Sequence, residues 1–389
     1  FSTRHAFMTK ELAEVIRRAD RDDANGFLHF AYLTWLTDSW LTDSVRPKLT
    51  YYELKTALQP VLVSAELYGR HWFAGEKITR RVAIANDADD GKDLSAGVLA
   101  WEFRAADGAV LSRGEMPSPL VKFYSNEWLE VEFGTPAKLP APRVNAQLTL
   151  TLTTGGKVVS QNHYDIVLAT REWAAAPMVS GQIFDPAGKS KAVTEKLALT
   201  MAKPADFDSG KLLVVGDAAA LVKSADGVAK LKRFVEDGGQ ALLLNAGGDA
   251  LTLFPEQLKS YRQAKNQGEI ATPLVPDSPV FDGIEPLDMA WFEPESRQVP
   301  QVCAGTYEVN RAAALPLALQ SRIHVDMEKK VKVDGKDIAT FKYFEDAGSP
   351  IVEIKLGKGK VILSEMTLEA ADRDPIAGRL LANMLKYLK

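Results

Sequence analysis

The chain has 389 residues, enough for two or three domains, and its 46% hydrophobic and 25% charged content is ordinary for a globular protein. Its net charge of −4 argues against a nucleic-acid binder, which would normally carry a basic face. No apolar run approaches the roughly 18 residues that would span a membrane. Cys303 is the only cysteine, so no internal disulfide is expected, which leaves the compartment open.

The first segment has the pattern of a helix. Met8, Leu12 and Val15 recur at helical spacing, with Glu11 and Glu14 between them. This periodicity predicts that the apolar residues face a core and that the glutamates face solvent. The expected solvent-exposed face also includes Arg17 and Arg18, and the expected apolar face also includes Ile16 and Ala19.

A buried strand and a second helix are expected next. Residues 27–33 form a short apolar and aromatic run, typical of a strand buried on both faces. The second helix, about 51–57, should present Tyr51, Leu54 and Leu58 together. A parallel strand needs neighbours and covering helices, and nothing later reads as more such units. We therefore expect the missing partners to precede Phe1 or to lie on another chain.

The stretch RPKLTYYELK at 46–55, which runs on to QPVLVS at 59–64, carries a specific resemblance. Together with RRAD at 17–20 and Gly26, it resembles the end of the catalytic (β/α)8 barrel of glycoside hydrolase family 2, the β-galactosidase and β-mannosidase group. The resemblance implies that residues 1–60 are the last part of such a barrel.

The resemblance also implies where a sugar would bind. Active sites of such barrels lie at the carboxyl ends of the strands, so Trp35, Asp38 and Trp40 would line the sugar site on the loop after strand eight. Indole faces suit the apolar faces of a pyranose, although both tryptophans could instead pack under the loop. His29 fits a core residue better than a ligand. The family's two catalytic glutamates would precede this chain, so no catalytic residue is assigned here.

Residues 61–175 change to short alternating runs separated by turn signals, which predicts an immunoglobulin-like β-sandwich. Trp72, Trp101 and Trp128 fit core or interface positions better than a sugar platform. The acidic run at 86–93 fails the spacing of a calcium loop and fits a hairpin turn. The expected strands are 61–67, 78–85, 97–103, 128–133, 146–153 and 163–168.

Residues 176–389 return to alternating strands and helices. Buried strands at 211–217, 240–245 and 360–364, a helix at 228–235 and a closing helix capped by Asp374 predict an open doubly wound α/β domain. Residues 250–345 form a proline-rich excursion with a hairpin turn at 334–335.

The stretch 233–243 resembles the class I glutamine amidotransferase-like fold, but the strand 241–244 is followed by Asn245 and Ala246 rather than by a nucleophilic cysteine. Cys303 stands in no comparable turn, and His324 is isolated. No glycine-rich dinucleotide fingerprint follows a strand. We therefore expect a non-catalytic accessory domain that requires no cofactor and no metal.

The expected whole is a multidomain α/β plus all-β protein: the last βα unit of a (β/α)8 barrel (1–60), an immunoglobulin-like sandwich (61–175) and an amidotransferase-like α/β domain (176–389). It would be the C-terminal portion of a hydrolase of β-glycosidic bonds, with an oligo- or polysaccharide substrate and the N-terminal remainder of the same enzyme as partners. A homo-oligomer stays open, as do a carbohydrate-binding or assembly module and an independent α/β enzyme. A secreted or periplasmic location is slightly favoured.

Overall fold

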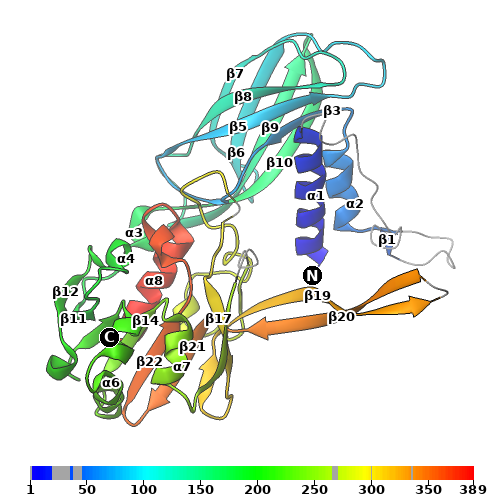
Figure 1. The fold of residues 1–389 in the computed structure, drawn as a ribbon. Coiled ribbons are helices and arrows are strands. Elements are labelled where there is room, and N and C mark those ends of the chain that lie inside the picture. Colours follow the sequence, from blue (N-terminus) through cyan, green and yellow to red (C-terminus); the bar gives the residue numbers. More distant parts are fainter. Residues whose placement is uncertain (1, 20–35, 38–45, 265–269, 299, 334–335) are drawn as a thin grey trace. The chain divides into compact units, whose positions relative to one another are not determined.

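The computed structural model describes residues 2–19, 36–37, 46–264, 270–298, 300–333 and 336–389 (Figure 1). The chain forms two compact units. Unit 1 comprises Phe1–Leu67 and Trp72–Ala169, and unit 2 comprises Tyr68–His71 and Thr170–Lys389. No helix within the described residues is long and apolar enough to cross a membrane.

Unit 1 opens with two helices. Helix α1 spans Ser2–Arg18 and helix α2 spans Leu49–Ala57, while β1 (Leu36–Thr37) pairs with β2 (Arg46–Pro47). The two helices pack together through a small apolar cluster, Ala13, Leu54 and Ala57. The expected strand at 27–33 lies outside the described residues.

The rest of unit 1 is a sandwich of two antiparallel sheets. One sheet has the order β3-β5-β8 and the other β4-β10-β9-β6-β7. Each of the six expected strands is present, and β4 and β7 are additional strands that the sequence pattern did not indicate. The strands are β3 (Val61–Ala65), β4 (His71–Phe73), β5 (Lys77–Asn86), β6 (Gly97–Ala105), β7 (Val110–Ser118), β8 (Ser125–Gly134), β9 (Arg143–Thr154) and β10 (Lys157–Ala169).

Aromatic residues fill the core of the sandwich. Trp72 is 1% exposed and stacks on Phe133, while Trp101 meets Phe103 and Phe133 edge to face. Such ring pairs add to the stabilisation from area burial. Trp72 and Trp101 are therefore core residues and cannot form a sugar platform, whereas Trp128 is half-buried under the Arg81 guanidinium, 3.8 Å from the ring centroid.

Unit 2 is built on a seven-stranded sheet of order β12-β11-β13-β14-β22-β21-β18. Neighbours from β12 to β22 are parallel, and β21 and β18 add antiparallel strands. The three buried strands expected from sequence are confirmed as β13, β14 and β22. The strands are β11 (Ser180–Phe184), β12 (Ala198–Met201), β13 (Leu212–Val215), β14 (Gln240–Leu244), β18 (Ala314–Pro316), β21 (Ile351–Leu356) and β22 (Gly359–Ser364).

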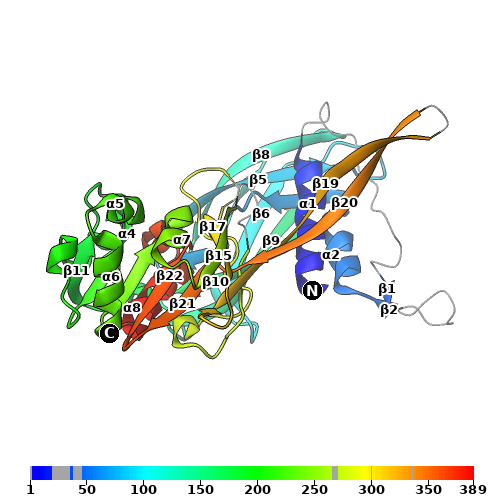
Figure 2. The ribbon, with the colours of Figure 1, turned by 60° about the horizontal axis from the view of Figure 1, so that its bottom comes forward.

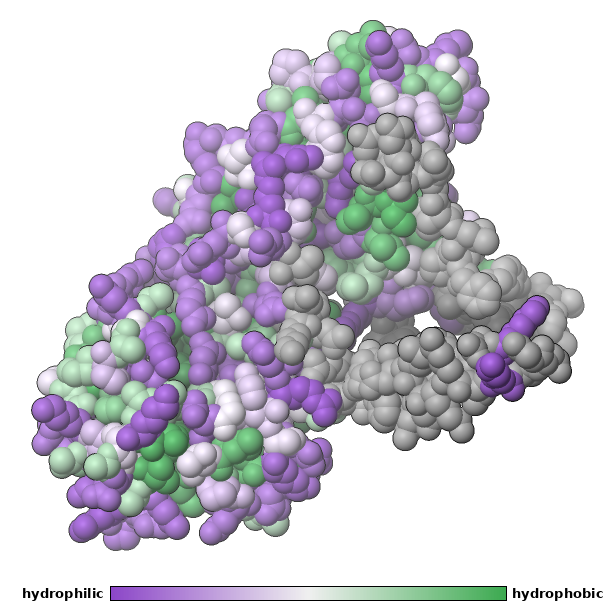
Figure 3. Space-filling model, viewed as in Figure 1, coloured by the Kyte–Doolittle hydropathy of each residue, from purple (hydrophilic) through white to green (hydrophobic). Residues whose placement is uncertain are grey.

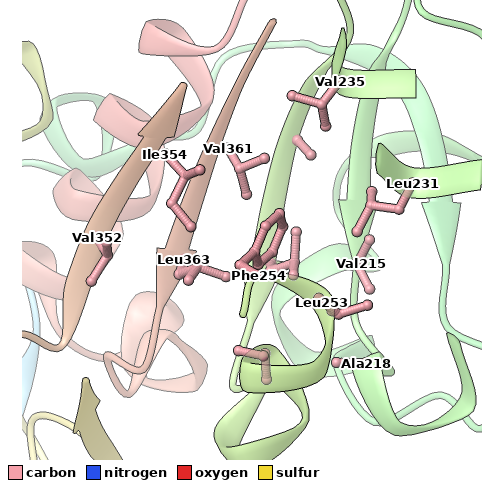
Figure 4. Packing of buried hydrophobic residues seen from close by; sticks show 14 of the residues in the cluster. Val215, Ala218, Leu231, Val235, Leu253, Phe254, Val352, Ile354, Val361 and Leu363 are labelled. Atoms are coloured by element: carbon pink, nitrogen blue, oxygen red, sulfur yellow. The ribbon is translucent and has the colours of Figure 1, made fainter. Parts of the chain in front are cut away.

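Helices cover this sheet and bury their apolar sides on it. Figure 4 shows Leu231 and Val235 of α6, Leu253 of α7 and the strand residues Val215 and Leu363 in one core. The helices are α3 (Arg171–Ala174), α4 (Lys191–Thr194), α5 (Ala218–Lys223), α6 (Gly227–Glu236), α7 (Ala250–Leu253) and α8 (Pro375–Tyr387), with short 3₁₀ turns at Pro204–Asp206, Gly247–Asp249, Pro279–Phe281 and Leu368–Asp372.

The proline-rich excursion carries smaller sheets. Strand β15 (Leu258–Gln263) pairs with β17 (Gly305–Val309), and β16 (Thr272–Pro273) pairs with the base of β19. Strands β19 (Ala318–Val333) and β20 (Lys336–Gly348) form a long antiparallel ribbon that projects from unit 2 (Figure 2). The pairing of Val333 with Lys336 confirms the expected hairpin, whose two turn residues lie outside the described residues.

Candidate functional site

The three residues expected to line a sugar site, Trp35, Asp38 and Trp40, lie outside the described residues, as does His29. The described elements nearest to them in sequence are the short pair β1 and β2 and helices α1 and α2. The chemistry that the structure does place in this part of the chain is therefore that of the two helices.

Helix α1 is turned the opposite way from the sequence expectation. Met8, Leu12 and Val15 are 44%, 62% and 51% exposed, whereas Glu14 is fully buried and Arg17 is 8% exposed. The prediction that the glutamate faces solvent and the apolar residues face a core is wrong for these positions. The physical reason is that polar groups of β3 and β10 lie under the helix and form hydrogen bonds with its charged side chains. We call this set of polar groups the seat of the helix.

Helix α2 adds to the exposed apolar surface. Leu49, Tyr52 and Leu58 are at least half exposed, and Tyr51 is 38% exposed, while Leu54 is buried against α1. The expected joint presentation of Tyr51, Leu54 and Leu58 is therefore wrong for Leu54. Figure 3 shows hydrophobic residues gathered over α1 and α2. Exposed apolar residues that gather in this way make α1 and α2 the candidate contact surface of unit 1.

Glu14 sits in a seat built from two strands. Ser64 Oγ of β3 donates to Glu14 Oε2 at 2.5 Å, and Tyr164 OH of β10 donates to the same oxygen at 2.8 Å. Asn162 Nδ2 of β10 donates to Oε1 at 2.9 Å. On the helix itself, Lys10 Nζ lies 2.8 Å from Oε1 and also donates to a backbone carbonyl of β10. Both carboxylate oxygens are thus satisfied by hydrogen bonds, as a buried charge requires.

The charges around this carboxylate decide its protonation. Burial raises the pKa of Glu14, but Lys10, Ser64 and Arg18 together outweigh that effect, so the pKa is lowered from its ordinary value. Arg18 Nη1 lies 3.6 Å from Glu14 Oε2. Burial and the neighbouring carboxylate raise the pKa of Tyr164 well above its usual range, which keeps its hydroxyl a donor. Glu14 is therefore an ionised, structural group in the described surroundings.

Arg17 makes a second fixed point on the same side of α1. Its guanidinium donates to the carbonyl of Ala57 at 2.9 Å and to the carbonyl of Gln59, and it pairs with Asp87 at 2.8 Å. These acceptors span the end of α2 and the turn after β5. Arg17 therefore holds α1, α2 and the sandwich together at the point where the chain passes from helix to strand.

Sequence reasoning missed this network because its helix residues have the spacing of a solvated face. Lys10, Glu14 and Arg18 follow each other at four-residue intervals, which is common on exposed helices. The available signal lay in the strands. Ser64 and Asn162 are isolated polar residues at buried positions of β3 and β10, and such residues need a partner.

In unit 2, the turn after β14 has the form of a tight elbow. Asn245 has a φ of 47°, a left-handed conformation that asparagine tolerates, and its side chain donates to Glu369 Oε1 at 2.8 Å. Cys303 is fully buried and pairs with Met366 through backbone bridges. Asn245 thus occupies the elbow, and Cys303 is 0% exposed.

Glu365 is the most deeply buried carboxyl group near this elbow. It follows β22, and its Oε1 accepts hydrogen bonds from Tyr307 OH at 2.5 Å and from Gly247 N at 2.9 Å. Tyr261 OH lies 3.4 Å from Oε2. Burial raises the pKa of Glu365 despite these donors, and burial beside this carboxyl raises the pKa of both tyrosines. The carboxyl group thus joins the end of β22 to the turn after β14 and to β17.

A third polar group lies where β11 and β13 end. Asp185 accepts from the backbone of Lys189 and Ser190, and Lys189 Nζ pairs with Asp217 at 2.7 Å. Burial raises the pKa of Asp217, but the hydrogen bonds from Lys189 and from the backbone of α5 outweigh it, and the net direction is downward. These contacts tie a loop to the start of α5. Within the described residues no group of three or more potential ligands could hold a metal ion.

No protein-family model and no curated protein matches this chain. Among solved structures it is similar to the exo-chitosanase CsxA of Amycolatopsis orientalis, at 19% identity over 40% of this chain and 18% of that one, with a TM-score of 0.28. A β-glucuronidase from glycoside hydrolase family 2 is 13% identical over 48% of this chain and 20% of that one, with a TM-score of 0.21. The sporulation control protein Spo0M of Bacillus subtilis is 15% identical over 29% of this chain and 51% of that one, with a TM-score of 0.20.

These solved structures include glycoside hydrolases of family 2, but their TM-scores are below those of proteins that share a fold. The chain spans about a fifth of the length of the two hydrolases.

Proposed function

We propose that this chain is the C-terminal portion of a glycoside hydrolase of the family 2 type, which cleaves β-glycosidic bonds as β-galactosidases and β-mannosidases do. In this proposal α1, α2 and the segment between them are the end of a (β/α)8 barrel. The sandwich of unit 1 is the immunoglobulin-like domain that follows the barrel, and the sheet of unit 2 is an amidotransferase-like accessory domain without catalysis.

The passage from α2 to β3 supports this proposal. Helix α2 begins directly after Arg46-Pro47-Lys48, and the chain runs through Gln59-Pro60 into the first strand of the sandwich. Arg17 fixes this junction through the carbonyls at the end of α2. The motif that resembles the end of the family's barrel thus forms a helix, and the first strand of the sandwich follows it directly. The proposal requires this order of elements.

The single observation that carries the proposal furthest is the outward apolar face of α1 and α2. Met8, Leu12 and Val15 lie on the side of α1 away from its seat, with α2 beside it. Helices of a (β/α)8 barrel bury such a face on the parallel strands. The occupant we propose is the preceding part of the same barrel, the N-terminal remainder of the enzyme.

The sugar site would then lie on the loop that follows the expected strand eight. Trp35, Trp40 and Asp38 would contact an oligo- or polysaccharide there, and the two catalytic glutamates would come from the N-terminal remainder. This chain would supply one wall of the site and two accessory domains.

The test compares the 389-residue chain with the complete polypeptide that its gene encodes. Both are assayed with a panel of p-nitrophenyl β-glycosides, with the α-anomers as controls. We expect turnover of a β-glycoside by the complete polypeptide and none by the 389-residue chain. Robust turnover by the short chain would contradict the proposal that it lacks the two catalytic glutamates. A complete polypeptide that is inactive on every β-glycoside would contradict the proposal that it is a glycoside hydrolase.

A non-catalytic module that binds carbohydrate or mediates assembly is the second candidate. The same exposed apolar face favours it, because an assembly module also needs a surface for a partner. The two candidates differ in the complete polypeptide. A module would bind its partner or a glycan without releasing p-nitrophenol from any glycoside.

A further inference from the structure

Helix α1 is rotated about its axis so that its charged side, and not its apolar side, faces the sandwich. It leaves Leu12 62% exposed and buries the charged Lys10, Glu14 and Arg17 to 4%, 0% and 8% exposure. Packing normally turns the apolar side of a helix toward the core and its charged side toward water. A specific set of contacts must therefore hold α1 in the inverted setting.

The two fixed points on α1 have the right geometry to do this. Glu14 takes donors from Ser64, Asn162 and Tyr164, which lie on two strands, and Arg17 donates to carbonyls at the end of α2. A helix turns by about 100° per residue, so these partners are reached together in one rotational setting only. Rotation by half a turn would separate both side chains from every one of these groups.

We infer that Glu14 and Arg17 form a rotational lock, which holds the apolar stripe of α1 (Met8, Leu12 and Val15) outward and prevents it from closing on the sandwich. Buried ionic groups are best attested in proteins as devices that select one packing arrangement among several. Here the rejected arrangement is the one in which the stripe packs on β3, β5 and β10 and is no longer available. The inference does not depend on which partner covers the stripe.

Single reporter cysteines can read the rotation of α1 directly. The only cysteine in the sequence, Cys303, is fully buried in unit 2, so an added cysteine gives the only accessible thiol. Leu12→Cys reports the outward side, and Ala6→Cys, at a position 3% exposed, reports the inward side. In the otherwise unchanged chain a maleimide should modify the Leu12→Cys reporter at least a hundredfold faster than the Ala6→Cys reporter.

The lock is broken with Glu14→Ala combined with Arg17→Ala. The matched control is Glu11→Ala with Arg4→Ala, which removes the same two charges from the less buried part of the same helix. We expect the broken lock to exchange the two reactivities: the Leu12→Cys thiol slows at least tenfold and the Ala6→Cys thiol speeds up at least tenfold. The control should change neither rate more than twofold.

Two results would overturn the inference. Unchanged rates at both reporters would mean that the lock is not needed for the setting. Fast modification of both reporters would mean that Glu14 and Arg17 tether α1 to the sandwich without setting its rotation. If the double variant does not fold, Ser64→Ala, which removes one donor to Glu14, is judged by the same criteria with about threefold changes expected in place of tenfold.

Discussion

The pKa values of two buried carboxyl groups of this chain are shifted in opposite directions, and their hydrogen-bond donors explain why. Burial acts on both, but Glu14 faces the cations of Lys10 and Arg18, whereas Glu365 faces neutral hydroxyls of Tyr307 and Tyr261. A cation favours the ionised form far more than a neutral donor does. The pKa of Glu14 is therefore lowered and that of Glu365 is raised.

This difference predicts a pH dependence for unit 2 that Glu365→Gln removes. Because its folded pKa is raised, Glu365 stabilises the fold fully below its unfolded pKa of about 4.5, and that contribution is lost as pH rises through the folded value. We expect the unfolding free energy, measured with urea at a series of pH values, to decline above pH 4.5 with a slope of at most about 1.4 kcal/mol per pH unit.

The comparison for this prediction is Glu308→Gln, an exposed carboxylate beside Tyr307 in β17. If the Glu365→Gln and Glu308→Gln chains show the same pH profile of unfolding free energy above pH 4.5, the assignment of the decline to Glu365 is wrong.

The buried carboxylate of Asp374 meets four partners in unit 2. Its Oδ1 accepts from the backbone of Ile376 and Ala377, and its Oδ2 accepts from Glu293 N and lies 2.9 Å from His71 Nδ1. Asp374→Ala removes the cap of α8 and leaves these groups without an acceptor, so we expect a loss of about 3 kcal/mol in unfolding free energy.

Asp374→Asn tests the reason for that loss. Its amide oxygen can still cap α8, but its nitrogen cannot accept the Glu293 hydrogen bond, so we expect about half of the loss in the same denaturation experiment. An alanine variant as stable as the unchanged chain would show that the cap contributes nothing.

The proposed function gives a prediction for Trp35 and Trp40 in the complete polypeptide. If Trp35 stacks on the sugar, Trp35→Ala should raise KM about fivefold, about 1 kcal/mol, with little change in kcat, and Trp35→Phe should restore most of the binding. We expect a smaller effect for Trp40→Ala. Steady-state kinetics with the best β-glycoside measure both. A Trp35→Ala enzyme with unchanged KM would place the indole outside the sugar site.

At the scale of elements, local patterns predicted best where a helix packs on its own apolar side. Helix α6 buries Leu231, Phe234 and Val235 as its spacing indicates, and α8 begins at the cap expected from Asp374 and Pro375. Helix α1 has an equally regular pattern and was predicted with the wrong face inward. The difference is tertiary, because the polar seat of Glu14 comes from strands that lie far along the sequence.

The exposed stripe of α1 predicts an effect of polar substitutions on association but not on folding. Leu12→Gln with Val15→Gln changes residues 62% and 51% exposed, so unfolding free energy should stay within about 0.5 kcal/mol. Binding of the separately produced N-terminal remainder, measured by calorimetry, should weaken at least tenfold, because each apolar side chain contributes about 1.5 kcal/mol or more when buried.

Val158→Gln provides the matched surface change for this experiment, since Val158 is 58% exposed on β10. It should leave binding unaltered. Equal binding by the stripe variant and by the Val158 variant would rule out the stripe as the contact surface.

At the scale of the whole molecule, each unit has a core of its own. The sandwich core contains Trp72 and Phe133, and the core of unit 2 contains Phe254 and Leu243. Separate cores of this size unfold as separate cooperative bodies. We expect calorimetry to show two transitions, with Asp374→Ala lowering only one of them. A single transition that shifts as a whole would contradict independent units.

The general architecture could be predicted because alternation and buried runs are local properties of the sequence. Six of the eight sandwich strands and the parallel strands β13, β14 and β22 followed from such runs, whereas β4 and β7 did not. The buried polar networks could not be predicted to the same degree. The seat of Glu14 joins residues 148 and 150 positions apart, and the elbow at Asn245 meets Glu365 only across the sheet. The spacing of residues within one segment does not indicate contacts between residues so far apart in the sequence.

The distant origin of that seat has a consequence for the order of events during synthesis. Tyr164 is made 150 residues after Glu14. At about 5–20 residues per second the ribosome needs roughly 8–30 seconds to supply it. Until then the buried carboxylate of α1 lacks its donors on β10, and only the Arg17 half of the lock can form. Whatever packs on α1 must therefore wait for a domain encoded downstream, so a premature stop within β10 would disable a surface that is already fully translated.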